Sequence, residues 1–529
     1  MVTKFGKLRM LTALLLALAL VLLAGCQSIA NVDFNKALTN ALKVTSSEGK
    51  QSVELKLELD EAALEDMPED ELALIKLLSN VKLQLDNVKA QDENHLSFDG
   101  SLAFGEEASI AFSAKLSDTL AVIELEGAKQ PFVLDMADAG FAGMPAEEAA
   151  AEVDIDSESL AAIGHRMLDT VGAYVINNLP NPERIEAKPA TEQVGGASVP
   201  MMHVHFDMNG PEIWAWVKQY VDALAADRAG LDRMIAGIYE IIEGSPELSE
   251  VLGIPALIEE GGLDAPTTED MLKEATDEIA ALLADWQAEM KKAEEAERAT
   301  LDTVFSESLA LKADVYVDAK LDIRKQAYEL TYVPGEAAAA DLAPLKGLKL
   351  TIAGEAWNVN GDVTAEAPAA SDDALGLEEL SEMHGYQLLK RFDETSAVYD
   401  LLKNTFHVGK QSISWYPYEY DNPVILTPAN ITIIPLRDTA DALGGKLSPN
   451  AKNKSIVLFD EATGTTIEVK VGSDAAIVNG KSVNWSFPVT SVDGVTYVPA
   501  RDLARALHAN LAWTTLYGDE KVFTLEREV

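Results

Sequence analysis

The chain has 529 residues, of which 48% are apolar, and its 42 basic and 87 acidic residues give a formal net charge of −45 at pH 7. A surface this acidic repels nucleic acid and anionic lipid headgroups, so we exclude nucleic acid as a partner. The length allows about three domains. The single cysteine, Cys26, excludes a fold that depends on internal disulfides.

The start of the chain has the layout of a secretory signal. A basic segment, residues 4–9, precedes an apolar run, residues 11–23, that is shorter than the ~20 residues needed to span a bilayer. The run ends in Leu23, Ala24, Gly25 and Cys26. This ending resembles a bacterial lipobox, which implies a covalent diacylglycerol on Cys26 and an extracytoplasmic chain anchored to the outer face of the cytoplasmic membrane. We expect a signal peptide over residues 1–25, then a lipidated tether and short helix over residues 26–50.

Residues 51–365 are predicted to form an acidic, β-rich domain. Val53, Leu55 and Leu57 alternate with charged residues, which is the period of a sheet with one solvated face, and similar alternation recurs further along the chain. Apolar residues then recur at helical spacing, so we expect a helical insertion at about residues 157–300 before strands return. This order predicts an α+β fold with a large antiparallel sheet.

The order of elements over roughly residues 30–365 resembles the half-barrel of lipoprotein-carrier proteins, a class that includes outer-membrane lipoprotein carriers and mycobacterial lipid-binding lipoproteins. The resemblance rests on the strand order, the lipidated start and the closing run at residues 356–360. It implies a half-barrel-like sheet that wraps around a helix. The sheet would then either offer an apolar cleft to an acyl chain or be filled by its own helices. The sequence leaves both alternatives open.

A linker and helical connector are expected over residues 366–421. The segment begins with Ala, Pro, Asp and Ser residues that cannot form a core, and apolar residues at helical spacing follow. Four aromatic residues lie near its end: Trp415, Tyr416, Tyr418 and Tyr420. Such a cluster either stacks on sugar rings or packs the joint between domains. We regard all four as candidate contacts for carbohydrate or a partner protein.

The segment from residue 422 to the end contains an internal repeat. Residues 432–443 return 64 positions later as residues 496–507, which predicts two equivalent units packed together. In each copy a strand ends at a proline, Pro435 or Pro499, and a proline suits the first turn of the helix that follows. We therefore expect a small α+β module built from two similar strand–helix units. This module has ten basic and twelve acidic residues, so the acidic excess lies before it.

Residues 422–529 resemble the copper amine oxidase N-terminal domain-like module, also called the stalk domain. Three short motifs carry the resemblance, through Pro435, Leu436, Arg437, Ala440, Ala442, Leu443, Gly444, Asn479, Gly480, Lys481, Tyr497, Val498, Pro499 and Arg501. His508 and Ala509 stand where a Gly-Ala pair is usual, which leaves the turn geometry there open. In the oxidases the module is a noncatalytic appendage, so the resemblance implies no active site.

Motifs that would indicate an enzyme are absent from the sequence. Copper amine oxidases carry an Asn-Tyr-Asp/Glu site, and here none of the 13 tyrosines follows an asparagine. His203 and His205 would lie on one face of a strand, as metal ligands require, but the sequence shows no third ligand nearby. They are weak metal candidates. We predict no catalytic residue, no metal and no cofactor besides the acyl group on Cys26, and we do not expect copper.

These observations favour a noncatalytic, lipid-anchored protein of the cell surface. Its partners would be the membrane, through the lipid anchor, and either cell-wall polymer or another envelope protein, through the C-terminal stalk-like module. Two alternatives remain open. One is a carrier of lipid or another hydrophobic ligand in the half-barrel, and the other is an unrecognised extracytoplasmic hydrolase or metal enzyme.

Overall fold

The computed structural model describes residues 33–529 except residues 66, 106–107, 137–156, 246–266, 336–341, 343, 417–421 and 516–520. The chain divides into two compact units. The first comprises the residues up to Leu125 and Pro131–Ala374, and the second comprises Glu126–Gln130 and Leu375–Val529. The residues that lie outside the described part include Leu23, Ala24, Gly25, Cys26, Tyr418 and Tyr420.

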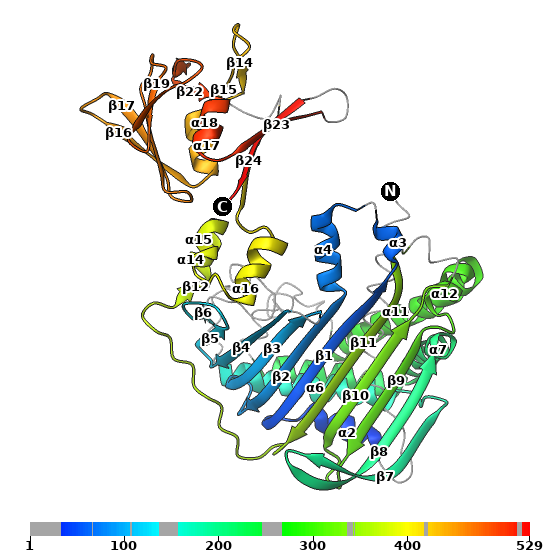
Figure 1. Ribbon diagram of the computed structural model, residues 1–529. Coiled ribbons are helices and arrows are strands. Elements are labelled where there is room, and N and C mark those ends of the chain that lie inside the picture. Colours follow the sequence, from blue (N-terminus) through cyan, green and yellow to red (C-terminus); the bar gives the residue numbers. More distant parts are fainter. Residues whose placement is uncertain are drawn as a thin grey trace. The chain divides into compact units, whose positions relative to one another are not determined.

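A large antiparallel sheet organises the first unit (Figure 1). The strands of this sheet that belong to the first unit follow the order β6-β5-β4-β3-β2-β1-β11-β10-β9-β8-β7. Their bounds are β1 (Ser47–Leu59), β2 (Asn80–Ala90), β3 (Leu96–Phe104), β4 (Ala108–Leu116), β5 (Leu120–Leu125), β6 (Phe132–Asp135), β7 (Ile185–Val194), β8 (Ala197–Asn209), β9 (Ala310–Val317), β10 (Ile323–Tyr332) and β11 (Leu345–Trp357). The sheet curves, and with its helices it confirms the predicted α+β, half-barrel-like fold. Because β1 begins at Ser47, the sheet includes the end of the segment expected as a tether and short helix.

Helices pack on one face of this sheet. Alternate residues of β8 and β9, such as Phe206 and Val315, form a buried core with Phe34 of α2 and Trp216 of α7. The opposite face carries charged side chains and is solvated. Within the described residues the helices of the first unit are α2 (Phe34–Ala41), α3 (Glu61–Leu64), α4 (Glu69–Leu78), α6 (Ser157–Asn177), α7 (Gly210–Ala226), α8 (Arg228–Glu243), α11 (Thr268–Ala296) and α12 (Arg298–Val304).

A β-hairpin interrupts the helical insertion expected at residues 157–300. Its strands, β7 and β8, lie between α6 and α7 and form one edge of the sheet. Pro189 and Pro200 lie within these strands, and proline weakens a strand pattern in the sequence. At the end of β8, Asn209 and Glu212 form a capping box that begins α7. The insertion is therefore helical only on either side of the hairpin.

The described part of the second unit holds three small sheets, with the orders β13-β24-β23, β14-β15-β22-β21 and β16-β17-β18-β19-β20. The strands are β13 (Lys410–Trp415), β14 (Ile425–Leu426), β15 (Thr432–Pro435), β16 (Gly445–Asn450), β17 (Ser455–Asp460), β18 (Thr465–Val469), β19 (Ala475–Val478), β20 (Lys481–Asn484), β21 (Thr490–Val492), β22 (Val495–Pro499), β23 (Asn510–Thr515) and β24 (Lys521–Glu528). β13 lies within the expected connector, residues 366–421, yet it pairs with β24 near the end of the chain. The C-terminal fold therefore begins before residue 422.

The helical part of that connector consists of short pieces. They are α14 (Leu377–Glu382), α15 (Gly385–Leu389), α16 (Ala397–Asp400) and the π-helix η2 (Leu401–Thr405). Tyr386 and Leu389 of α15 and Val398 of α16 are buried within the second unit. These helices thus form part of the second unit, which begins again at Leu375.

Equivalent residues of the two repeats meet in the second unit. Ile434 of β15 lies opposite Val498 of β22, and the offset of 64 positions makes Val498 its counterpart. Because the strands are antiparallel, this pairing relates the two copies by a local twofold arrangement. The helices α17 (Leu436–Ala442) and α18 (Ala500–Ala506) follow the two strands directly. The prediction of two similar strand–helix units is confirmed.

Candidate functional site

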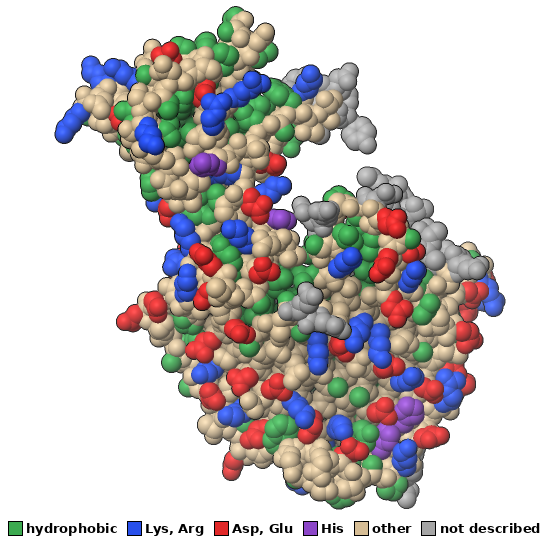
Figure 2. Space-filling view, viewed as in Figure 1, with side chains coloured by type: hydrophobic (Ala, Val, Ile, Leu, Met, Phe, Trp, Pro, Cys, Tyr) green, Lys and Arg blue, Asp and Glu red, His purple; other side chains and the backbone are tan. Residues whose placement is uncertain are grey.

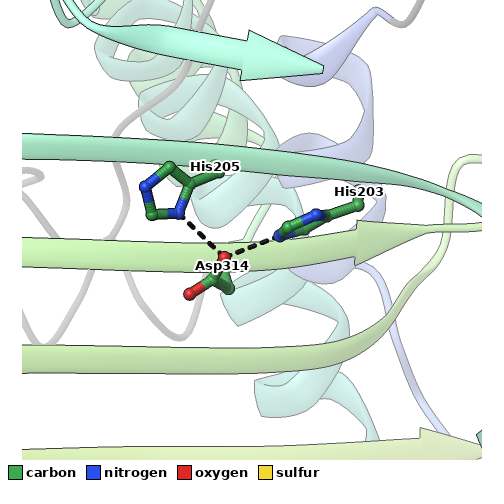
Figure 3. A group of neighbouring side chains, drawn as sticks. All are labelled: His203, His205 and Asp314. Atoms are coloured by element: carbon green, nitrogen blue, oxygen red, sulfur yellow. Dashed lines mark hydrogen bonds and ion pairs between the residues drawn. The ribbon is translucent and has the colours of Figure 1, made fainter. Parts of the chain in front are cut away.

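Three side chains that could ligate a metal lie together on the solvated face of the first unit's sheet (Figure 3). His203 and His205 are two residues apart on β8, so both point to the same face, while Val204 between them is buried in the core on the other face. Asp314 of β9 is the cross-strand partner of His205. The register of β8 on β9 therefore brings the carboxylate to the two imidazoles.

One carboxylate oxygen contacts both rings. Asp314 Oδ1 lies 2.6 Å from His203 Nε2 and 2.8 Å from His205 Nδ1. The three side chains are partly buried, with 12% of the His203 side chain exposed, 38% of His205 and 36% of Asp314. Burial opposes ionisation of Asp314, but the hydrogen bonds from His203 and His205 outweigh it and lower the pKa of the carboxyl group. The site thus holds an ionised carboxylate between two imidazoles.

Neighbouring side chains hold His203 in place. Its ring stacks on Tyr316, with a centroid distance of 4.4 Å and an interplanar angle of 8°. Lys325 Nζ lies 5.4 Å from the centre of the Tyr316 ring and 2.7 Å from the carboxylate of Glu192. In Figure 2 histidine side chains lie among acidic and basic ones on this face. The sequence identified His203 and His205 but missed Asp314, which is separated from His205 by 109 positions.

The aromatic residues near residue 415 differ in their surroundings. Trp415 is buried in the core of the second unit and contacts Phe523, its cross-strand partner on β24. Tyr416 is exposed, whereas Tyr418 and Tyr420 lie outside the described residues. Trp415 therefore stabilises the fold of this unit and is not an exposed platform for sugar.

A different tryptophan provides an exposed ring. Trp513 of β23 pairs with Phe523 from the other side, at a centroid distance of 4.7 Å, and its exposed fraction is 53%. Trp415, Phe523 and Trp513 form an aromatic row across three strands, of which only Trp513 is exposed. Trp513 could not be identified from the sequence, since a lone tryptophan in a strand carries no signal of its exposure.

The positive-φ turn at the end of each repeat helix is preserved. Gly444 has φ +69° and its counterpart His508 has φ +56°. His508, which stands where glycine is usual, therefore adopts the same turn conformation, although a residue with a Cβ disfavours it.

Comparison with known proteins identifies the C-terminal segment. Residues 416–517 match the family model described as the copper amine oxidase N-terminal domain. Comparison with curated proteins and with solved structures returned no match. No helix within the described residues is long and apolar enough to cross a membrane. The segment expected to be a stalk module thus matches the noncatalytic N-terminal domain of copper amine oxidases, and this match supplies no catalytic residue.

Proposed function

We propose that the protein is a noncatalytic, lipid-anchored component of the cell envelope, held at the outer face of the cytoplasmic membrane and bound to cell-wall polymer through its C-terminal module. The family match to residues 416–517 carries this proposal, because the matched domain is a stalk-type module outside any catalytic domain. The charge distribution supports it. The nearly neutral module can approach an anionic wall, whereas the acidic residues before it are repelled.

The contact surface we propose is centred on Trp513. An exposed aromatic ring can stack on the apolar face of a sugar, and one side of the Trp513 ring contacts the buried ring of Phe523. Tyr416, also exposed, adds a second aromatic side chain to the same unit. Acylation of Cys26 would attach the other end of the protein to the membrane. An acyl anchor combined with a second contact holds a protein stably at a surface.

Cosedimentation of the full chain with purified cell-wall sacculi tests this contact. We expect Trp513→Ala to reduce the pelleted fraction at least about threefold, because loss of a stacked ring costs about 1 kcal/mol. Phe406→Ala is the matched control, because Phe406 is an exposed aromatic of the same unit outside the aromatic row. Equal pelleting of the Trp513 variant and the wild type would contradict the proposed surface.

A second function, carriage of an apolar ligand, has one specific observation in its favour. On the helix-covered face, an apolar row crosses eight strands from β8 to β4, through Phe206, Ala313, Tyr328, Ile352, Val53, Leu83, Leu102 and Ile110. Phe206 and Ala313 are fully buried, but Val53 in the middle of the row is exposed. The helices thus cover one end of the row and leave apolar surface further along it.

Organic extraction of the protein after mild purification tests this alternative. A carrier releases a stoichiometric apolar ligand, and Val53→Asp, which places a charge in the row, should abolish its release. Glu54→Gln, on the solvated face of the same strand, is the control. An extract that contains no apolar ligand would contradict the carrier function.

A further inference from the structure

We infer that His203, His205 and Asp314 form a binding site for a divalent first-row transition metal ion, with Zn²⁺ as the representative ion. The inference is independent of the envelope function proposed above, because it concerns the solvated face of the first unit's sheet. It rests on the kind, the number and the placement of the three side chains.

The donor set selects the class of metal. Two imidazole nitrogens and one carboxylate oxygen suit Zn²⁺, Cu²⁺ and their neighbours, whereas Ca²⁺ and Mg²⁺ prefer ligand sets made of oxygen. Three protein ligands with a water molecule in the fourth position are a common arrangement for Zn²⁺.

The distances between donor atoms are close to those that a metal ion needs. The three ligand atoms lie within 4.8 Å of one another. With metal–ligand distances of about 2.1 Å, tetrahedral geometry separates a nitrogen from an oxygen ligand by about 3.4 Å. The observed separations from Asp314 Oδ1 are 2.6 Å and 2.8 Å. Each imidazole nitrogen therefore has to move away from Asp314 Oδ1 by less than about 1 Å to admit an ion.

The strands hold the donors in a fixed arrangement. All three residues lie within the β8–β9 ladder and none lies on a loop. The stacking of His203 on Tyr316 restricts the ring that is least exposed. Two basic side chains on the same face are paired, Lys325 with Glu192 and Lys312 with Glu329. On β7, Glu186 lies opposite His205 and Lys188 lies opposite His203. The two ion pairs reduce the repulsion of a cation, and the strongly acidic chain attracts it.

Calorimetric titration of the full chain with Zn²⁺ tests the site. The protein carries Cys26→Ser, which removes the thiol as a competing ligand, and excess Ca²⁺ is present to occupy carboxylate clusters elsewhere on the acidic surface. We expect one equivalent of Zn²⁺ to bind, and His205→Ala and Asp314→Asn each to weaken binding at least about tenfold. With Co²⁺ in place of Zn²⁺, the wild type should show the visible absorption of a nitrogen-ligated, tetrahedral ion.

The control variant is His95→Ala. His95 Nδ1 lies 2.8 Å from Asp92 Oδ1, so it forms a histidine–aspartate pair without a second imidazole, and its removal should leave Zn²⁺ binding unchanged. Asp314→Asn is nearly isosteric, and a circular dichroism melt of each variant separates loss of a ligand from loss of the fold. Absence of Zn²⁺ binding by the wild type would overturn the inference. So would folded Asp314→Asn and His205→Ala variants that bind Zn²⁺ as tightly as the wild type does.

Discussion

The guanidinium group of Arg527 is completely buried against the carboxylate of Asp460, to which it donates two hydrogen bonds. Arg527 also donates to the backbone carbonyls of Leu443 and Leu507, which are equivalent positions at the ends of the two repeat helices. The Arg527 guanidinium thus donates a hydrogen bond to a carbonyl at the C-terminus of each repeat helix, where positive charge is favourable. The pair joins the two copies of the repeat to each other.

Replacement of Arg527 should therefore unfold much of the second unit. Arg527→Ala leaves the buried Asp460 carboxylate without an opposite charge, which costs about 3–5 kcal/mol. Arg505→Ala is the control, because Arg505 is exposed and its ion pair with Asp502 should contribute about 1 kcal/mol or less. Amide hydrogen exchange of β24 measures the effect. Unchanged protection in Arg527→Ala would show that the pair is not required.

The same pair predicts an acid-sensitive second unit. Burial alone would raise the pKa of Asp460, but the hydrogen bonds from Arg527 and Thr463 and the charge of Arg527 outweigh it and lower the pKa in the folded state. A lowered folded pKa stabilises the fold at pH values above the unfolded pKa of about 3.9. This stabilisation is lost as the pH falls through the lower, folded pKa. We expect hydrogen-exchange protection of β24 to fall with pH in that acidic window, after correction for intrinsic exchange rates.

An Asp460→Asn variant distinguishes this cause from general acid effects. It should be less stable near neutral pH, because the ion pair is lost, and its stability should depend less on pH in the acidic window. An identical pH dependence in the wild type and in Asp460→Asn would assign the acid sensitivity to other carboxyl groups.

The turn at His508 offers a stabilising substitution. His508 has φ +56°, a conformation that costs a residue with a Cβ about 1 kcal/mol and costs glycine almost nothing. We expect His508→Gly to raise the free energy of unfolding of the second unit by up to about 1 kcal/mol, measured in urea by hydrogen exchange. Gly444→Ala at the equivalent turn should have the opposite effect. A destabilising His508→Gly would show that the histidine side chain makes contacts that outweigh the strain.

The first unit contains a position where only glycine fits. A Cβ at Gly210, the first residue of α7, would lie 2.2 Å from the backbone oxygen of Ser306 and 2.3 Å from the carbonyl carbon of Phe305. Since backbone atoms cannot give way cheaply, Gly210→Ala should destabilise the first unit by about 2 kcal/mol or more. Gly164→Ala in α6 meets no atom within 4 Å and should stabilise that helix slightly. Thermal melts of the two variants should therefore shift in opposite directions.

Local patterns in the sequence were sufficient for much of the fold. The alternation around Val53 predicts β1, and the repeat predicts that the strands containing Ile434 and Val498 are equivalent. A strand was considered only at His203 and His205, since prolines obscure the alternation in the rest of the hairpin β7–β8. Strand β13 was missed because its pairing partner, β24, lies near the end of the chain. Short-range spacing carries no information about such long-range pairings.

In the candidate site, too, short-range spacing predicts part of the geometry and long-range strand pairing determines the rest. The spacing of His203 and His205 places both rings on one face, and that much is readable from a strand's period of two. Asp314 joins them only through the register of β8 on β9, across a separation of 109 positions. Similarly, the aromatic run around Trp415 left open whether its rings stack on sugar or pack against protein. Pairing with Phe523 buries Trp415 and leaves Trp513 as the exposed ring of the aromatic row.

The most direct test of the envelope function compares two forms of the protein in cosedimentation with purified cell-wall sacculi. One is the full chain, and the other ends at Ala374, where the first unit ends, with circular dichroism used to check that its sheet is intact. We predict that the full chain pellets with the sacculi at moderate salt and that the shortened chain stays in solution. Equal pelleting of both forms, or of neither, would contradict wall binding by the C-terminal module.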